Sequence, residues 1–288
     1  MKLSIISPNL GEACFLYRGH PFTRLPIEYR LYDGSKGFTL HDAIMFGDAV
    51  LMLRPFTAQQ AEICRVIKGT GKALLIDFDD DYTCLPSFNP SKKSFDGCLP
   101  NLQAMMKEAD AVTVSSQALV NAVTAWGAKK AVLVKNAIDD SFKSMVPKQE
   151  RSKTLLWRGG PSHSGDLYAG RETFKRMNKT HEIVFVGAVP DFAYELRHKH
   201  IPTSDYAAYL VAMNNVAPEY VYVPLVDCPF NHAKSDCAAS EAYLIGAKLI
   251  HSNFGEFAGL PETGTPRWLS DVNNLRMEVL RDFHSSRS

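Results

Sequence analysis

The chain has 288 residues, which is enough for two domains of ordinary size. Its composition, 45% hydrophobic and 22% charged, is typical of soluble globular proteins, and a formal net charge of +1 gives no overall basic bias toward nucleic acids or membranes. The six cysteines, at positions 14, 64, 84, 98, 228 and 237, form no Cys-x-x-Cys pair and no zinc-site pattern, so we expect free thiols and a reducing, cytoplasmic location.

The first half of the chain alternates apolar runs with amphipathic segments. Its first residues turn polar too early for a signal peptide, and no apolar run approaches the roughly 20 residues of a membrane helix, so no integral membrane segment is expected. Residues 85–100 contain three prolines and are assigned as irregular. The apolar runs predict strands at residues 3–7, 27–32, 49–53, 72–77, 111–114 and 131–134. The segments between them predict helices at residues 39–46, 58–68, 102–108 and 116–126.

The same pattern restarts after a polar connection at residues 136–148. Strands are predicted at residues 154–157, 182–186, 219–224 and 248–251. Helices are predicted at residues 167–177, 204–213, 235–245 and 272–283, and Ser204 is the predicted cap of the second of them. Strands alternating with helices at this spacing indicate parallel βαβ units. We therefore predict an α/β protein with two Rossmann-like domains that face each other across a cleft, at residues 1–149 and 150–271. A C-terminal helix within residues 272–288 is expected to pack back on the first domain through an apolar stripe of Val272, Leu275, Val279 and Leu280. Ligands of such sheets bind at the carboxyl ends of the strands.

A candidate anion site follows the strand at residues 154–157. Arg158, Gly159, Gly160 and a polar turn containing His163 come next, before a predicted helix. Glycines let the backbone approach a ligand, free N–H groups at a helix start face negative charge, and the arginine adds a permanent cation. The alternative is an ordinary strand-to-helix loop with a surface arginine.

A second candidate stretch, residues 229–246, reads PFNHAKSDCAASEAYLIG. Ser235 is the predicted N-cap of the helix, Lys234 lies just before it, and Glu241 lies near its second turn. A lysine for phosphate and a carboxylate for ribose hydroxyls are what a nucleotide diphosphate requires. The alternative is a solvated lysine and a surface glutamate.

These two stretches, LLWRGGPSHSGDL and FNHAKSDCAASEAYLIGAKLIHS, resemble the C-terminal domain of GT-B glycosyltransferases, closest to the large retaining family that includes sucrose synthase and many bacterial glycan transferases. The segments DAVLMLRPF, GKALLIDFDDDYTCLP and DAVTVSSQALVNAVTAWGAKKAVLVKNAID resemble that family's N-terminal domain. The resemblance implies that Arg158 and Lys234 hold the diphosphate of a UDP- or GDP-sugar and that Glu241 holds its ribose. It also implies retention of anomeric configuration, no metal for donor binding and no tightly bound cofactor.

The chain departs from the family pattern at one position. The family often has two glutamates eight positions apart, and the residue eight before Glu241 is Ala233. The residue that usually carries out the role of the first glutamate is therefore missing. We expect the neighbouring Lys234 to take over part of that role.

Two further groups are candidates for catalysis. Residues 77–81 carry four carboxylates at the end of a predicted strand, where they are costly unless paired, solvated or bound. Asp79 and Asp80 are assigned to the acceptor or the chemistry; the alternatives are an exposed acidic turn and, less favoured, a metal site. His20, in the loop after the first strand, is a candidate base or hydrogen-bond donor, with a structural role as its alternative.

The predicted function is transfer of a sugar from a nucleotide-diphosphate sugar to an acceptor hydroxyl. The acceptor is left open between a glycan, a small molecule and DNA with hydroxymethylated pyrimidines, because basic clusters at Lys92-Lys93, Lys129-Lys130 and Arg18/Arg24/Arg30 permit DNA. A sugar-nucleotide epimerase and a non-catalytic sugar-nucleotide-binding protein are the alternatives.

Overall fold

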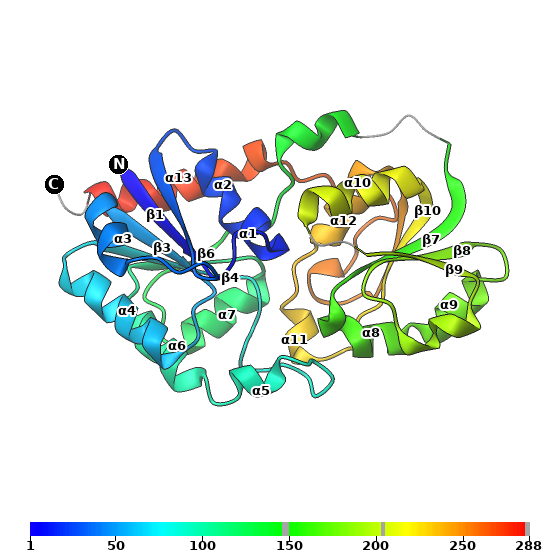
Figure 1. The fold of residues 1–288 in the computed structure, drawn as a ribbon, viewed down its shortest axis with the longest axis horizontal. Coiled ribbons are helices and arrows are strands. Elements are labelled where there is room, and N and C mark those ends of the chain that lie inside the picture. Colours follow the sequence, from blue (N-terminus) through cyan, green and yellow to red (C-terminus); the bar gives the residue numbers. More distant parts are fainter. Residues whose placement is uncertain (146–149, 203–204, 286–288) are drawn as a thin grey trace.

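The computed structural model describes residues 1–145, 150–202 and 205–285, and it contains two parallel sheets with helices around them (Figure 1). The first sheet has the strand order β2-β1-β3-β4-β5-β6. Its strands are β1 Lys2–Ser7, β2 Glu28–Asp33, β3 Ala49–Leu53, β4 Ala73–Phe78, β5 Ala111–Val114 and β6 Ala131–Leu133. The second sheet has the order β11-β10-β7-β8-β9. Its strands are β7 Ser152–Gly159, β8 Glu182–Gly187, β9 His198–Ile201, β10 Pro218–Val223 and β11 Lys248–His251.

Helices separate the strands in both halves. Those associated with the first sheet are α1 Ala13–Arg18, α2 His20–Thr23, α3 Leu40–Phe46, α4 Ala58–Gly69, α5 Lys92–Phe95, α6 Leu99–Glu108 and α7 Gln117–Ala125. Those that follow are α8 Ser164–Ala169, α9 Arg171–Met177, α10 Tyr206–Val216, α11 Pro229–His232, α12 Cys237–Leu244 and α13 Leu269–Ser285. The predicted α/β class with two Rossmann-like domains is confirmed. The exact domain bounds stay predictions, and residue 149, the predicted boundary, lies outside the described residues.

Most predicted elements lie within three residues of the observed ones. The helix predicted at residues 167–177 is two helices, α8 and α9, and α5 lies within residues 85–100, which were assigned as irregular. Other differences have physical reasons. Helices α1 and α2 have only six and four residues, too short to give a helical hydrophobic period. Strand β9 reads His-Lys-His-Ile and forms the edge of its sheet, so it lacks the apolar run of a central strand. The predicted cap Ser204 lies outside the described residues, and the observed N-cap of α10 is Asp205, whose Oδ1 accepts the N–H of Ala208 at 2.8 Å.

Packing of the first sheet uses both of its faces. One face packs with α3, α4, α6 and α7 through residues that include Ile6, Val50 and Ile76. The other face, with Leu3, Ile5 and Leu51, packs with α1, α2 and the end of α13. Because residues on one strand alternate between faces, the buried runs of β1 and β3 supply both layers. Among the described residues, no helix combines the length and the apolar character needed to cross a lipid bilayer.

Helix α13 returns to the first sheet after the second sheet is complete, and Figure 1 shows it running along the first half. Val279, Leu280 and Phe283 join the apolar cluster beneath that sheet. The predicted apolar stripe also contained Leu275, which is 39% exposed. Arg276 is buried instead. At 100° per residue, the face of the helix that points inward consists of residues 272, 276, 279, 280 and 283, and Leu275 lies at the margin of this face.

This geometry predicts unequal costs for two identical substitutions in α13. Leu280→Ala removes a fully buried side chain and should lower the free energy of unfolding by about 2–4 kcal/mol. Leu275→Ala, the matched control on the exposed margin, should change it by less than about 0.5 kcal/mol. Urea denaturation followed by circular dichroism measures both, and equal costs would show that the helix does not pack as described.

Candidate functional site

The residues predicted to bind a nucleotide sugar lie at the carboxyl ends of strands in the second sheet, where this sheet faces the first. Arg158 is the last residue but one of β7, and Lys234 lies between α11 and α12. Asp79 and Asp80 follow β4 of the first sheet. The structure thus brings predicted residues from both halves of the chain to one boundary.

Arg158 and Glu241 form one buried ion pair. Arg158 Nη2 lies 2.6 Å from Glu241 Oε2, and Nε donates to the same oxygen at 2.8 Å. Burial opposes the charge of Arg158, but the carboxylate of Glu241 outweighs it, so the pKa of the guanidinium is raised above its ordinary value. The resemblance assigned these two residues to different parts of a donor; in this structure they neutralise each other.

Two tyrosines complete the environment of Glu241, which is only 1% exposed. Tyr209 of α10 donates its hydroxyl to Oε2 at 2.8 Å, and Tyr17 of α1 donates to Oε1. Tyr17 belongs to the first half of the chain, so this bond crosses between the two sheets. Glu241 is therefore a buried acceptor held by three donors, and the alternative of a surface helix residue is wrong.

Lys234 and Asp80 form a second ion pair across the same boundary. Lys234 Nζ lies 2.8 Å from Asp80 Oδ1, and it also lies over the ring of Phe230, 4.4 Å from the centroid. Burial disfavours both charges, yet the partner's charge prevails in each case: the pKa of Asp80 is lowered and the pKa of Lys234 is raised. Both groups are consequently ionised at neutral pH.

His163 is oriented by a carboxylate that sequence reasoning did not assign to the site. His163 Nδ1 lies 2.8 Å from Oδ2 of the buried Asp166, whose Oδ1 accepts from the N–H of Val226 and from Nδ2 of Asn231. Burial is the main reason why the pKa of His163 is lowered. The spacing of His163 and Asp166, three positions apart at a helix start, is the signal that could have indicated this pair.

The glycines and the serine of the predicted site have distinct environments. Gly187, next to Gly159 across the β7–β8 ladder, has φ +99°, and a Cβ there would overlap Gly159 O. A Cβ on Gly160 would meet no atom within 4 Å, so the backbone has open space on that side.

Ser235 is not the N-cap of α12, contrary to the prediction. The N-cap is Asp236, and Ser235 Oγ accepts from Nδ2 of Asn136 at 2.8 Å.

The four carboxylates of residues 77–81 have four separate partners. Asp77 is buried and takes two bonds from Arg18, at 2.8 and 2.6 Å. Asp79 Oδ1 lies 3.2 Å from Arg54 Nε without the alignment of a hydrogen bond. Asp80 pairs with Lys234, and Asp81 Oδ1 accepts the N–H of Thr83 in a local turn at 2.9 Å. The described residues contain no group of three or more His, Cys, Asp and Glu arranged to hold a metal ion.

Arg54 is a residue of this boundary that the sequence did not single out. It is one of two described non-glycine residues with positive φ, at +54°. Its Nε donates to Tyr82 Oη at 2.9 Å and its Nη1 to Glu12 Oε2 at 3.0 Å. A non-glycine residue in this region costs about 1–3 kcal/mol and persists where surrounding contacts hold it. These contacts hold the guanidinium beside Asp79 at the end of β3.

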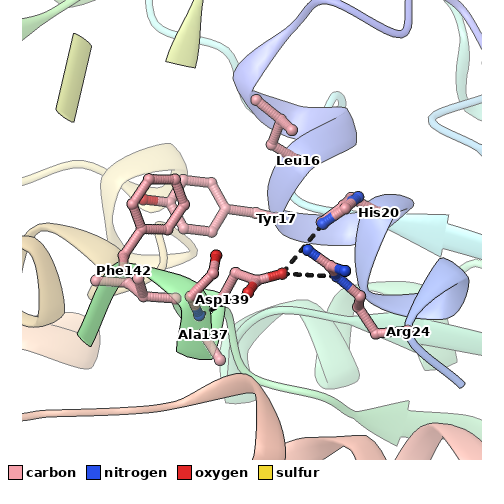
Figure 2. A pocket seen from close by; sticks show the side chains of 9 residues that line it. Leu16, Tyr17, His20, Arg24, Ala137, Asp139 and Phe142 are labelled. Atoms are coloured by element: carbon pink, nitrogen blue, oxygen red, sulfur yellow. Dashed lines mark hydrogen bonds and ion pairs between the residues drawn. The ribbon is translucent and has the colours of Figure 1, made fainter. Parts of the chain in front are cut away.

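His20 is not brought together with the other predicted residues. It lies in a cavity of about 160 Å³ between α1, α2 and the residues after β6 (Figure 2). There His20 Nε2 lies 3.2 Å from Asp139 Oδ2, which also accepts from Arg24 Nε at 2.9 Å. Its catalytic role stays a prediction, without a contact to Asp80 or Lys234 in support.

Ala233, where the family pattern has a glutamate, is buried against the first half of the chain. It belongs to the apolar cluster of the first sheet, and its carbonyl accepts from Ser116 Oγ at 2.7 Å. Close packing thus occupies the place where a longer acidic side chain would lie.

Other bonds join the two halves around this site. Lys135 Nζ lies 2.7 Å from Glu256 Oε2, and Ser164 Oγ donates to Phe88 O at 3.2 Å. A Cβ on Gly165 would overlap the ring of Phe88. The two halves therefore meet through polar bonds and through packing.

Comparisons with known proteins place this geometry in a fold family. No family model matches the chain, and no curated protein matches it in sequence. Among solved structures the chain is similar to HepE from Anabaena, in complex with UDP and glucose: identity is 15%, the match covers 99% of this chain and 91% of HepE, and the TM-score is 0.58. It is similar to sucrose-phosphate synthase from Thermosynechococcus elongatus, with 12% identity, 99% and 91% coverage and a TM-score of 0.55. It is also similar to UDP-GlcNAc 2-epimerase from Neisseria meningitidis bound to UDP-GlcNAc, with 11% identity, 88% and 82% coverage and a TM-score of 0.52. The expected fold is confirmed: the chain has the GT-B fold.

Proposed function

We propose that this chain is a GT-B glycosyltransferase that moves a sugar from a nucleotide-diphosphate sugar to an acceptor hydroxyl. The observation that carries the proposal is the pair of cations, Arg158 and Lys234, where the second sheet faces the first. Lys234 is neutralised by Asp80, a carboxylate that a ligand can replace, and Arg158 is paired with Glu241. Structural similarity to HepE, in complex with UDP and glucose, and to a sucrose-phosphate synthase supports it.

Binding of the donor exchanges protein partners for ligand partners. The diphosphate takes the place of Asp80 on Lys234 and approaches Arg158 through the open space at Gly160. Hydroxyls of the ribose donate to Glu241 and replace one or both of its tyrosine donors. Since the cations are already fixed in position, little reorganisation is needed when charge develops.

In the transfer step, the bond between the anomeric carbon and the diphosphate oxygen breaks, and a bond between that carbon and the acceptor oxygen forms. The acceptor proton passes to a base, and Asp80, released from Lys234, is the carboxylate we assign to it. Negative charge grows on the leaving diphosphate, and Arg158 and Lys234 neutralise it. We assign His163 to the same site as a hydrogen-bonding group fixed by Asp166. Retention at the anomeric carbon is what the resemblance implies, and nuclear magnetic resonance of the product tests it.

UDP is the nucleotide to test first, because the HepE crystal contains it, and GDP is the second. An epimerase is the weaker alternative, since its structural match covers less of this chain. Incubation of a UDP-sugar without acceptor separates the two classes: an epimerase changes the sugar, whereas a transferase needs an acceptor. Acceptor-dependent release of UDP would also exclude a protein that only binds sugar nucleotides. The cytoplasmic location expected from the cysteines belongs to this proposal.

A glycan or small-molecule acceptor fits the surface better than DNA does. Four of the seven basic residues that permitted DNA pair with a carboxylate: Arg18 with Asp77, Arg24 with Asp139, Lys92 with Asp96 and Lys130 with Asp282. We therefore expect no salt-sensitive shift of hydroxymethylated duplex DNA in a gel. A shift that weakens steeply with salt would favour the DNA acceptor.

The donor site predicts a specific loss on truncation of Lys234. Lys234→Ala should weaken UDP binding by about 1.5–3 kcal/mol, the range for a hydrogen bond to a charged group, as measured by calorimetry. Lys135→Ala is the matched control, because it also removes a lysine that pairs with a carboxylate across the boundary, but lies outside the donor site. An unchanged affinity in Lys234→Ala would exclude this residue from the site.

The proposed role of Asp80 predicts that its substitution lowers turnover without weakening the binding of UDP. Asp80→Asn removes the charge that competes with the diphosphate, so UDP affinity should hold or rise, while kcat should fall at least about tenfold if Asp80 accepts the proton. Asp81→Asn is the control, since Asp81 bonds only to a local turn in the described contacts. A variant with full turnover and tighter UDP binding would make Asp80 a competing counterion and nothing more.

A further inference from the structure

Strand β2 is an edge strand with little protection. It pairs only with β1 among the described strands and has six residues, against three in β6 and four each in β9 and β11, the other three edges. Its first four residues are all exposed, including Tyr29 at 41% and Leu31 at 38%. A long exposed edge is a template for pairing with another strand.

The direction of the backbone groups in β2 follows from one hydrogen bond. Gly34 N–H donates to Ser7 O of β1 at 2.8 Å, so the backbone of residue 34 points inward. Groups alternate along a strand, so residues 28, 30 and 32 also point to β1, whereas the N–H and C=O of Tyr29 and Leu31 point outward. These outward groups form the surface that a partner strand would meet.

The side chains of β2 form two different faces. Tyr29 and Leu31 continue the face of Leu3 and Ile5, and Ile27 precedes them on the same side. Glu28 and Arg30 lie on the opposite face, where the guanidinium of Arg30 stacks 4.4 Å from the ring centroid of Phe46 in α3. The apolar row and the charged row thus lie on opposite faces of the exposed edge.

An antiparallel copy of the same strand has few allowed registers. Directly opposed residues must both point outward or both inward, so the two residue numbers must add to an even value. Pairing centred on Glu28 opposes two carboxylates, and pairing centred on Arg30 opposes two guanidinium groups. Pairing centred on Leu31 sets Arg30 against Tyr32 and leaves its charge without a partner. Pairing centred on Tyr29 sets Glu28 against Arg30 twice and Ile27 against Leu31 twice.

We infer that the chain forms a two-fold homodimer by antiparallel pairing of two β2 strands about Tyr29. Glu28 and Arg30 then occupy non-hydrogen-bonded pairs, in which opposed side chains are closest, and each Arg30 is already held on Phe46. The two six-stranded sheets become one continuous sheet. The groove lined by Lys2, Arg30, Asp42, Met45 and Phe46 lies at the new seam, where the two α3 helices flank it on one face.

The dimer leaves the proposed donor site free. Helix α3, which contacts β2, lies near the left end of the first half in Figure 1, away from the second sheet. The inference is therefore independent of the proposed function, and it rests on the pairing pattern of one strand.

A charge-swap cycle tests the register. Light scattering after size-exclusion chromatography should give twice the 32.0 kDa of the chain for the unmodified protein at micromolar concentration. Glu28→Arg and Arg30→Glu should each give the monomer mass, because each opposes like charges. The double variant Glu28→Arg/Arg30→Glu restores opposite charges and should restore the dimer. Lys93→Glu, an exposed lysine on α5, is the control for a change of charge elsewhere.

The double variant alters both contacts within the chain, Glu28 with Lys2 and Arg30 with Phe46. If the single variants were monomeric only because these contacts were lost, the double variant would be monomeric too, so a restored dimer points to pairing between two chains. Circular dichroism checks that each variant is folded. A monomeric unmodified protein, a dimer that tolerates the single swaps, or a folded double variant that stays monomeric would each overturn the inference.

Discussion

A charge removed from water has to be neutralised, and the boundary between the two halves meets this requirement with the protein's own groups. Arg18 with Asp77, Lys234 with Asp80 and Arg158 with Glu241 are each paired at hydrogen-bond distance. Removing one partner of a buried pair leaves an uncompensated charge, which is strongly destabilising. In these three pairs the boundary therefore leaves no charge without a partner. In the function that we propose, a diphosphate takes the place of Asp80 on Lys234.

The ion pairs differ in how much of their side chains solvent can reach. Arg18 and Asp77 are almost fully inaccessible, and Arg18 also donates to Asn136, which in turn donates to Ser235 of the second half. This chain of bonds ties β4 to the start of α12 at the base of the boundary. Lys234 and Asp80 lie nearer the solvent and each keep about a fifth of their side chain exposed. Solvent can therefore reach the second pair, whereas the first is almost fully inaccessible.

Sequence patterns specified the sheets well, because parallel strands buried on both faces are continuous apolar runs, as in β3 and β4. They also predicted Arg158, Lys234 and Glu241 as donor-binding residues, and this assignment stays a prediction. They did not reveal that Arg158 and Glu241 neutralise each other, since the partner of a charge is set by tertiary distance. Tyr17 and Tyr209 lie far from Glu241 in the chain, and no local period points to them. Arg54 was hidden for another reason: its positive φ is a property of the backbone path and leaves no mark in residue order. His20 was placed by its position after β1, but α1 and α2 carry it away to Asp139.

The contact between Gly165 and Phe88 limits how closely the two halves approach each other. The aromatic ring fills the volume that a side chain at position 165 would need. A larger residue there would have to displace this ring or shift the start of α8. The neighbours of Gly165 already have partners, because Ser164 Oγ donates to Phe88 O and Asp166 Oδ1 accepts the N–H of Val226. A side chain at this one position would therefore disturb bonds in both halves at once.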